Sequence, residues 1–297
     1  MNKPKLIVVA GTNASGKSAL GVALAEKYNA EIISADSRQV FRGFDLGSGK
    51  ITPEEMRGVR HHLIDVCGAG DFFSMHDFQK LAYRAIEDIL SRGKLPMIVG
   101  GTGLYIASVT DGYVMSDREP DLAYRDELEK LETPDLYRML LEKVPDIQVD
   151  AKNRNRVMRI LEKLHDGDDH LPHKDPRYDC LKLGVTWDRE TLKARIDERL
   201  EKRMQQGMVD EVKSLLNQGA SVEFMNKLGL EYRYITQYLT GEIASEAEMC
   251  TQLSLAIKRF AKRQMTWFRR EKDMHWLDMT ADPFAQACAL IDDFLRG

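Results

Sequence analysis

The sequence has 297 residues, 43% of them hydrophobic and 30% charged, and carries a net charge of −4, a composition that can bury one large core with or without a smaller attached domain. The short apolar run at the N-terminus does not match a secretory signal, and no later stretch reaches the ~20 apolar residues that span a bilayer. The four scattered cysteines lack a metal-binding spacing. We therefore expect a cytoplasmic protein with reduced thiols and no membrane contact.

Short β-branched runs alternate with helical patterns in the first third of the chain. A helix begins at about Ser18, and another is predicted over residues 76–91. Strands are predicted at residues 5–10, 31–35, 62–66 and 96–99. Strands that alternate with helices give right-handed crossovers and a parallel sheet, so the predicted fold class is α/β.

Strand signals stop at about residue 115. Residues 120–165 show helical patterns broken at Pro134 and Pro145, and residues 165–180 are rich in turn-forming residues. Strand character returns at 181–187, and long helices are predicted at 189–206, 207–217 and 246–272. This order predicts a core formed by residues 1–115 and 180–297, interrupted by a helical insertion at residues 116–179.

Residues 11–18 read GTNASGKS and match the phosphate-loop pattern GxxxxGKS/T between a strand and a helix. Glycines let backbone N–H groups converge on phosphate oxygens, and the helix N-terminus favours negative charge. Lys17 adds a cation, and the Ser18 hydroxyl can complete a Mg²⁺ shell. The predicted phosphate-binding residues are Gly11, Thr12, Asn13, Ala14, Ser15, Gly16, Lys17 and Ser18. The motif does not specify which phosphate compound binds.

Two further polar features follow predicted strands. Asp36 comes after residues 31–35 and should face the ligand crevice at the carboxyl end of a parallel strand. Its position alone fits a magnesium ligand, a catalytic base or a helix N-cap equally well. The sequence Gly100-Gly101-Thr102-Gly103 follows residues 96–99 at the same edge of the sheet, and a plain turn is as good an interpretation as a binding loop.

Basic residues are concentrated in two segments. Residues 258–272 hold seven Lys or Arg against Glu271, and residues 152–163 hold five against Glu162. On a helix over 253–270, one face would be cationic and the opposite stripe mainly apolar. The cationic face would contain Arg259, Lys262, Arg263, Thr266, Arg269 and Arg270, and the stripe Leu253, Ile257, Phe260, Gln264, Trp267 and Phe268. Either a solvated face or contact with RNA phosphates fits this pattern.

Taken together, these motifs resemble the tRNA dimethylallyltransferases (tRNA isopentenyltransferases) of the bacterial type. The matching stretches keep the family order and run nearly end to end. They are GTNASGKS (11–18), ISADSRQVFRGFDLGSGK (33–50), RHHLIDV (60–66), FSMHDFQ (73–79), VGGTGLYIASVTDG (99–112), NRNRVMRILE (153–162), RIDERLEKRMQQGMVDEV (195–212), KRFAKRQMTWFRR (258–270) and HWLD (275–278). The elements around Asp36 and AKRQMTW are specific to this family, whereas a phosphate loop alone is not.

The resemblance implies a P-loop NTPase-like core that binds dimethylallyl diphosphate with Mg²⁺, and a helical insertion that helps to hold the anticodon stem-loop of tRNA. It implies transfer of the dimethylallyl group to the exocyclic amine of the adenosine 3′-adjacent to the anticodon. Separately from the resemblance, we expect a monomer. By resemblance, Lys17 and Ser18 hold diphosphate and Mg²⁺, Asp36 is the general base, and Thr102 contacts the target nucleotide. The implied tRNA-binding residues are Asp36, Ser37, Arg38, Gln39, Thr102, Asn153, Arg154, Arg156, Arg159, Arg259, Lys262, Arg263 and Gln264.

Two stretches depart from the family pattern. Residues 165–180 lack the usual Ser-Gly-Lys element, and residues 226–233 read NKLGLEYR where many members have an Ala-Ile-Gly-Tyr type stretch. Three other functions share part of the pattern: a P-loop kinase, a prenyltransferase acting on free AMP, and a regulatory GTPase. The kinase and the AMP enzyme have little use for the insertion and the basic segments, and the GTPase would need an NKxD motif where this chain has NKLG.

Overall fold

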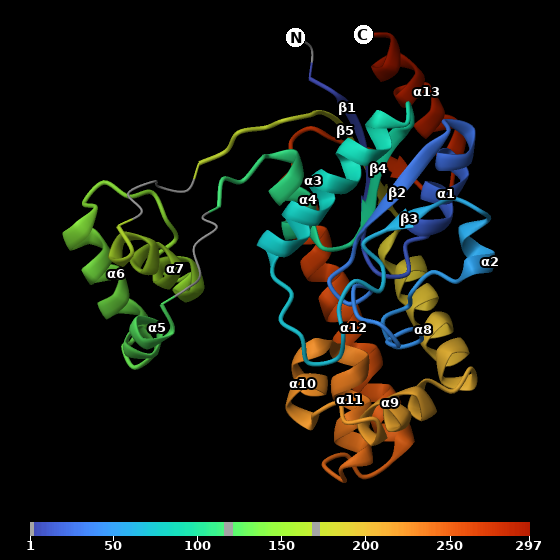
Figure 1. The fold of residues 1–297 in the computed structure, drawn as a ribbon. Helices are drawn as coiled ribbons and strands as arrows, with labels where there is room; N and C mark the ends of the chain where they lie inside the picture. The colour runs from blue at the N-terminus through green and yellow to red at the C-terminus, as the bar shows by residue number, and fades with distance from the viewer. Residues whose placement is uncertain (1–2, 116–120, 168–172) are drawn as a thin grey trace. The chain divides into compact units, whose positions relative to one another are not determined.

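The computed structural model describes residues 3–115, 121–167 and 173–297, and these form two compact units (Figure 1). The first unit comprises Met1–Thr110 and Arg177–Gly297, and the second comprises Asp111–Pro176. Within these described ranges, no helix combines the length and apolar character needed to cross a membrane. Each unit has its own hydrophobic core.

The first unit is built on a six-stranded sheet in the order β3-β2-β4-β1-β5-β6, in which every neighbouring pair is parallel. The strands are β1 (Lys5–Gly11), β2 (Ala30–Ala35), β3 (His61–His62), β4 (Leu95–Gly100), β5 (Asp179–Thr186) and β6 (Met274–Asp278). This sheet confirms the predicted α/β class. The predicted strand at 62–66 is wrong beyond His62, because Leu63 and Asp65 adopt positive φ angles of 64° and 57°, which an extended strand does not allow.

Helices cover both faces of the sheet. Leu6 and Val8 of β1 point into a core shared with α3, α4 and the end of α12, whereas Ile7 and Val9 point into a core shared with α1 and α13. The helices of this unit are α1 (Lys17–Lys27), α2 (Pro53–Met56), α3 (Met75–Ser91), α4 (Gly103–Thr110), α8 (Arg189–Gln205), α9 (Met208–Asn217), α10 (Val222–Leu228), α11 (Leu230–Leu239), α12 (Glu246–Phe268) and α13 (Pro283–Arg296).

A third core lies beyond the carboxyl ends of the strands, among α8 to α11 and the part of α12 up to Ala261 (Figure 1). Val40, Phe41 and Phe44, from the segment after β2, pack into it. Phe44 is fully buried and contacts the ring of Tyr232 edge-to-face at 5.2 Å. The helical core therefore holds the segment that follows Asp36.

The described residues of the second unit form three helices, α5 (Leu122–Glu129), α6 (Thr133–Lys143) and α7 (Arg154–His165). Pro134 lies in the first turn of α6, where proline is tolerated, so it marks the start of a helix. Buried leucines from the three helices, with Val157 and Ile160 of α7, form the core. Within the predicted turn-rich segment 165–180, α7 ends at His165 and β5 begins at Asp179, and residues 168–172 lie outside the described residues.

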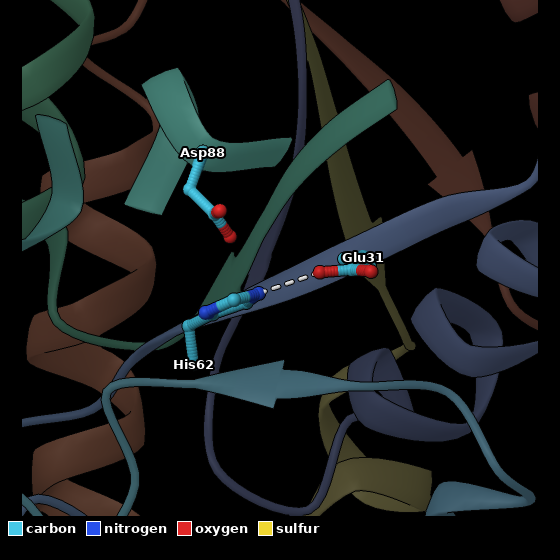
Figure 2. Close-up of side chains that lie close together, drawn as sticks. All are labelled: Glu31, His62 and Asp88. Atoms are coloured by element: carbon cyan, nitrogen blue, oxygen red, sulfur yellow. Dashed lines mark hydrogen bonds and ion pairs between the residues drawn. The ribbon is translucent and has the colours of Figure 1, made fainter. Parts of the chain in front are cut away.

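Charged side chains from β2, β3 and α3 form a cluster, in which Glu31 lies near the amino-terminal end of β2 (Figure 2). The Glu31 carboxylate is 2% exposed and accepts hydrogen bonds from Arg92, with Nη2 at 2.7 Å, and it faces His62 Nε2 at 2.7 Å. Lys94 Nζ lies 3.0 Å from Glu31 Oε1, and Asp88 pairs with Arg92 at 2.7 Å. The hydrogen bonds from Arg92 and His62 hold the pKa of Glu31 well below its usual value despite burial.

Glu31, His62 and Asp88 are spaced closely enough to bind a metal ion together. However, both oxygens of Glu31 already contact cationic side chains, which would have to move before a metal could bind. We therefore interpret this cluster as a structural ion network that links β2, β3 and the end of α3.

We expect Glu31→Gln to lower the free energy of unfolding by about 2 kcal/mol at pH 7, because it breaks a buried ion network whose arginine is partly screened by water. Since the folded-state pKa of Glu31 is depressed, its contribution should be complete above the unfolded pKa of roughly 4.3 and should disappear as pH falls further. Urea unfolding of the protein and of Glu31→Gln between pH 3 and 7 measures this difference. A pH-independent gap, or one equal to that of the exposed Glu201→Gln, would contradict it.

Candidate active site at the phosphate loop

The phosphate loop connects β1 to α1 and is held from outside by side chains of other elements. Arg195 Nε donates to the carbonyl of Ala14 at 3.0 Å, and Trp187 Nε1 donates to the carbonyl of Ser15 at 2.9 Å. Gly16 has a φ of 86°, which glycine adopts without strain. No side chain caps α1, so the N–H groups of its first turn are available to an anion.

Two hollows meet at this loop. The larger encloses about 560 Å³ and is lined by the loop, the start of α1 and α8, including Arg195 and Arg199. The smaller, of about 70 Å³, is lined by Asp36, Arg38 and Gln39 among others. Lys17 and Ser18 line both hollows. Lys17 therefore lies between a ligand in the larger hollow and a second ligand in the smaller one.

The electrostatic surroundings of Lys17 suit an anionic ligand. Its Nζ donates to the carbonyl of Thr12 at 3.2 Å. Burial and the nearby Arg199 lower the pKa of Lys17 to about 8, while Asp36 acts in the opposite direction. Burial also lowers the pKa of Arg199 to about 10, with Arg203 contributing. Burial outweighs the nearby carboxylates at both cations, so a bound diphosphate would stabilise their charged forms.

Asp36 follows β2 directly, but the chain then turns over residues 37–40 and no helix starts there. Its Oδ1 accepts a hydrogen bond from Arg38 N at 2.9 Å, so it stabilises a turn. This placement excludes the helix N-cap interpretation and leaves the base and the magnesium ligand open. Ser37 N donates to Thr102 Oγ1 at 3.2 Å, which brings Thr102 beside this turn.

Three arginines that the sequence analysis did not single out also face the loop. Arg195, Arg199 and Arg203 are spaced four residues apart on α8, so they share one helix face. Arg199 Nη2 donates to the carbonyl of Gly49 at 3.4 Å, and Gln39 Nε2 donates to the same carbonyl at 3.1 Å. The four-residue spacing of the arginines was the signal that could have identified them.

The segment that carries Gly49 is positioned by another residue that sequence reasoning missed. The Glu211 carboxylate accepts hydrogen bonds from the consecutive N–H groups of residues 45, 46 and 47, at 3.1, 2.6 and 3.0 Å. Tyr232 Oη donates to the same carboxylate at 3.2 Å and accepts from Ser48 N at 2.9 Å. Glu211 and Tyr232 thus fix the wall of the smaller hollow.

Helix α12 presents the expected cationic face. The exposed basic side chains of the helix are Arg259, Lys262 and Arg263, and the exposed Arg269 and Arg270 follow directly after its end. The guanidinium groups of Arg38 and Arg263 lie 5.4 and 5.5 Å from the ring centre of Phe260. Trp267, expected in the apolar stripe, is 36% exposed, whereas Gln264 is buried.

The second unit contains the remaining residues with a predicted tRNA contact. Arg154 donates to the carbonyls of Leu128, Glu129 and Leu131, so it caps the end of α5. Arg159 pairs with the buried Glu162 at 2.9 Å, and Asn153 caps α7 by accepting from Arg156 N. Of these four, only Arg156 is exposed and makes no side-chain contact of this kind with the described residues.

Comparisons with known proteins show which family this chain belongs to. The model of the IPP transferase family matches residues 39–271. A relative from Citrifermentans bemidjiense, "tRNA dimethylallyltransferase 2", is 42% identical over 97% of this chain and 95% of its own length. The chain belongs to the tRNA dimethylallyltransferase family. A second member, the tRNA dimethylallyltransferase of Streptococcus pyogenes, is 41% identical over 96% of this chain and 95% of its own.

Solved structures of family members share the fold. A tRNA isopentenylpyrophosphate transferase from Bacillus halodurans has a TM-score of 0.75 and 36% identity, and the match covers 99% of this chain and 96% of that one. A eukaryotic dimethylallyltransferase, captured in crystals acting on tRNA, has a TM-score of 0.82 and 26% identity, with 99% and 80% covered. Membership confirms the resemblance, the P-loop-type fold and the prediction of a prenyltransferase. The roles predicted for individual residues stay predictions.

Proposed function

We propose that this prenyltransferase moves the dimethylallyl group from dimethylallyl diphosphate to the exocyclic amine of the adenosine 3′-adjacent to the anticodon of tRNA. The observation that supports this most is the pair of hollows that meet at Lys17. The larger one, next to the phosphate loop and Arg199, suits the diphosphate. The smaller one, next to Asp36, suits the acceptor amine.

On the donor side, the bond between the allylic carbon and the diphosphate oxygen breaks, and its electrons stay with the diphosphate. Negative charge therefore grows on the leaving oxygen in the transition state. The free N–H groups of α1, Lys17 and Arg199 surround the hollow in which that charge develops. Groups already oriented toward developing charge lower the barrier more than they stabilise the bound substrate.

On the acceptor side, the adenine must leave its stack at a cost of a few kcal/mol, which contacts in the pocket offset. The amine nitrogen attacks the allylic carbon and loses a proton, and Asp36 is the carboxylate available to accept it. Thr102, held against Ser37, is placed to contact the nucleotide. The products are the prenylated adenosine and diphosphate.

Magnesium fits the donor set of this site. Ser18, which lines both hollows, supplies a hard oxygen donor, and Mg²⁺ prefers oxygen ligands together with substrate phosphates. Bound there with Ser18, the ion would neutralise charge on the diphosphate oxygens.

For the macromolecular substrate, the exposed basic face of α12 and the exposed Arg156 of α7 are the surfaces that we propose contact tRNA phosphates. The four cysteines form no disulfide, which fits a reducing cytoplasm. We propose that the enzyme works there as a monomer.

We expect the purified protein to transfer label from ¹⁴C-dimethylallyl diphosphate to tRNA, and not to AMP or ATP offered in separate reactions. Sequencing of the labelled tRNA should place the product at the adenosine after the anticodon. Label recovered in AMP would instead support the free-nucleotide enzyme. Phosphate release from ATP coupled to a small-molecule acceptor would support a kinase.

We expect Asp36→Asn to slow prenyl transfer by about 10²- to 10⁴-fold, the usual effect of a positioned base, while folding and donor affinity change little. Asparagine keeps the turn because its side-chain oxygen can still accept from Arg38 N. Single-turnover transfer to an anticodon stem-loop at two Mg²⁺ concentrations measures the rate. Rescue by higher Mg²⁺ would make Asp36 a metal ligand, and a rate near that of the unmodified enzyme would remove it from the mechanism.

We expect replacement of Arg259, Lys262 and Arg263 by glutamine to weaken tRNA binding and flatten its salt dependence. Each lost phosphate contact should lower the slope of log K against log salt by about 0.7–0.9. Replacing Lys193, Lys213 and Lys227, which lie on other helices, gives a control of equal charge change. An unchanged slope would make the cationic face of α12 a solvated surface.

A further inference from the structure

Gln264 differs from its neighbours on α12. Lys262 and Arg263 are exposed, whereas Gln264 is 7% exposed and has both ends of its amide engaged. Its Oε1 accepts from Asn13 N at 3.0 Å, and its Nε2 donates to the carbonyl of Gly101 at 2.9 Å. One side chain thus bonds to the phosphate loop and to the loop that follows β4.

The two loops that Gln264 contacts belong to the donor side and the acceptor side of the proposed reaction. Asn13 belongs to the phosphate loop, whose Thr12 carbonyl accepts from Lys17. Gly101 precedes Thr102, which accepts from Ser37 beside Asp36. We propose that Gln264 is a positioning residue that fixes the donor loop relative to the acceptor loop, without itself contacting tRNA. This inference rests on the proposed use of the phosphate loop for the donor diphosphate.

The space around Gly101 shows how tightly the loops approach each other. A Cβ added to Gly101 would lie 2.8 Å from Gln264 Nε2, 3.2 Å from the carbonyl oxygen of Gly11 and 3.6 Å from Lys17 Cε. The glycine therefore lets the carbonyl of Gly101 reach the amide of Gln264. A shift of Gln264 would disturb its hydrogen bonds to both loops.

The contact requires one group that accepts and donates. A neutral amide meets this need, whereas an ionised carboxylate can only accept and would face the carbonyl of Gly101. A protonated carboxylic acid again has both an acceptor and a donor. The side chain of glutamate in this place would therefore reproduce the contact only when it is protonated.

The charged groups near such a glutamate are Lys17, whose Cε is close to Gly101, and, around Lys17, Asp36, Arg199 and Arg203. Burial and the carbonyl of Gly101 favour the neutral acid, whereas Lys17 favours the carboxylate. Because Lys17 itself titrates, the rate of the variant has to be compared with that of the unmodified enzyme at each pH.

The test uses Gln264→Leu and Gln264→Glu, with Gln252→Leu and Gln252→Glu as matched controls, since Gln252 lies on the same helix and pairs with Glu248. The measurements are the affinity for magnesium pyrophosphate by calorimetry, the affinity for tRNA, and single-turnover prenyl transfer. For Gln264→Leu we expect about tenfold losses in pyrophosphate affinity and transfer rate, with tRNA affinity changed by less than about twofold.

For Gln264→Glu we expect the transfer rate, divided by that of the unmodified enzyme, to rise as pH falls from 8 to 5.5, while the same ratio for Gln252→Glu stays flat. A flat ratio for Gln264→Glu would overturn the proposal. So would weaker tRNA binding with unchanged pyrophosphate affinity in Gln264→Leu, because that pattern belongs to an RNA contact. If Gln264→Leu does not fold, the pH ratio of Gln264→Glu decides alone.

A failure of the proposed donor site has a different signature. Lys17→Ala should then keep full affinity for magnesium pyrophosphate. The opposite outcome is that Lys17→Ala loses this affinity, while Gln264→Leu keeps it and transfers at the normal rate. That outcome would support the donor site and refute the positioning role of Gln264.

Discussion

The shared register of three parallel strands brings the candidate active-site groups together. Ala10 of β1 and Ala35 of β2 both pair with Gly100 of β4, so the three strands end side by side. The phosphate loop, the Asp36 turn and the Gly101–Gly103 loop leave the sheet within one or two residues of that row. Parallel strands place their carboxyl ends at one edge, and ligands of such sheets bind outside that edge. A register slip would separate these groups.

Side chains of the helices beyond this edge, and Trp187 in the connection from β5 to α8, complete the site by hydrogen bonds to backbone atoms. Arg195 and Trp187 donate hydrogen bonds to carbonyls of the phosphate loop. Glu211 accepts hydrogen bonds from the successive N–H groups of residues 45–47. Gln264 reaches from α12 into the space between the loops. Side chains that bond to backbone fix its conformation before a ligand binds, which reduces the reorganisation needed during the reaction.

Buried charged side chains at the two edges of the sheet have different roles, one structural and one in ligand binding. Glu31 at the amino ends of the strands is paired with Arg92, His62 and Lys94, so its charge is compensated within the protein. Lys17 and Arg199 at the opposite edge are buried with little compensation, and their pKa values fall. Buried cations whose pKa values are lowered in this way indicate where an anionic ligand binds. The same residue types therefore have different roles because their partners differ.

The sequence alone determined the α/β class, most strand and helix positions, the phosphate loop and the family, because these depend on local patterns and short motifs. It overextended the strand at 62–66, where positive φ angles at Leu63 and Asp65 end the pairing, and it missed β6, which is a strand only because it pairs with β5. Only the tertiary structure placed Asp36 in a turn and Gln264 between two loops. Both depend on contacts between residues far apart in the chain, and no local pattern records such contacts.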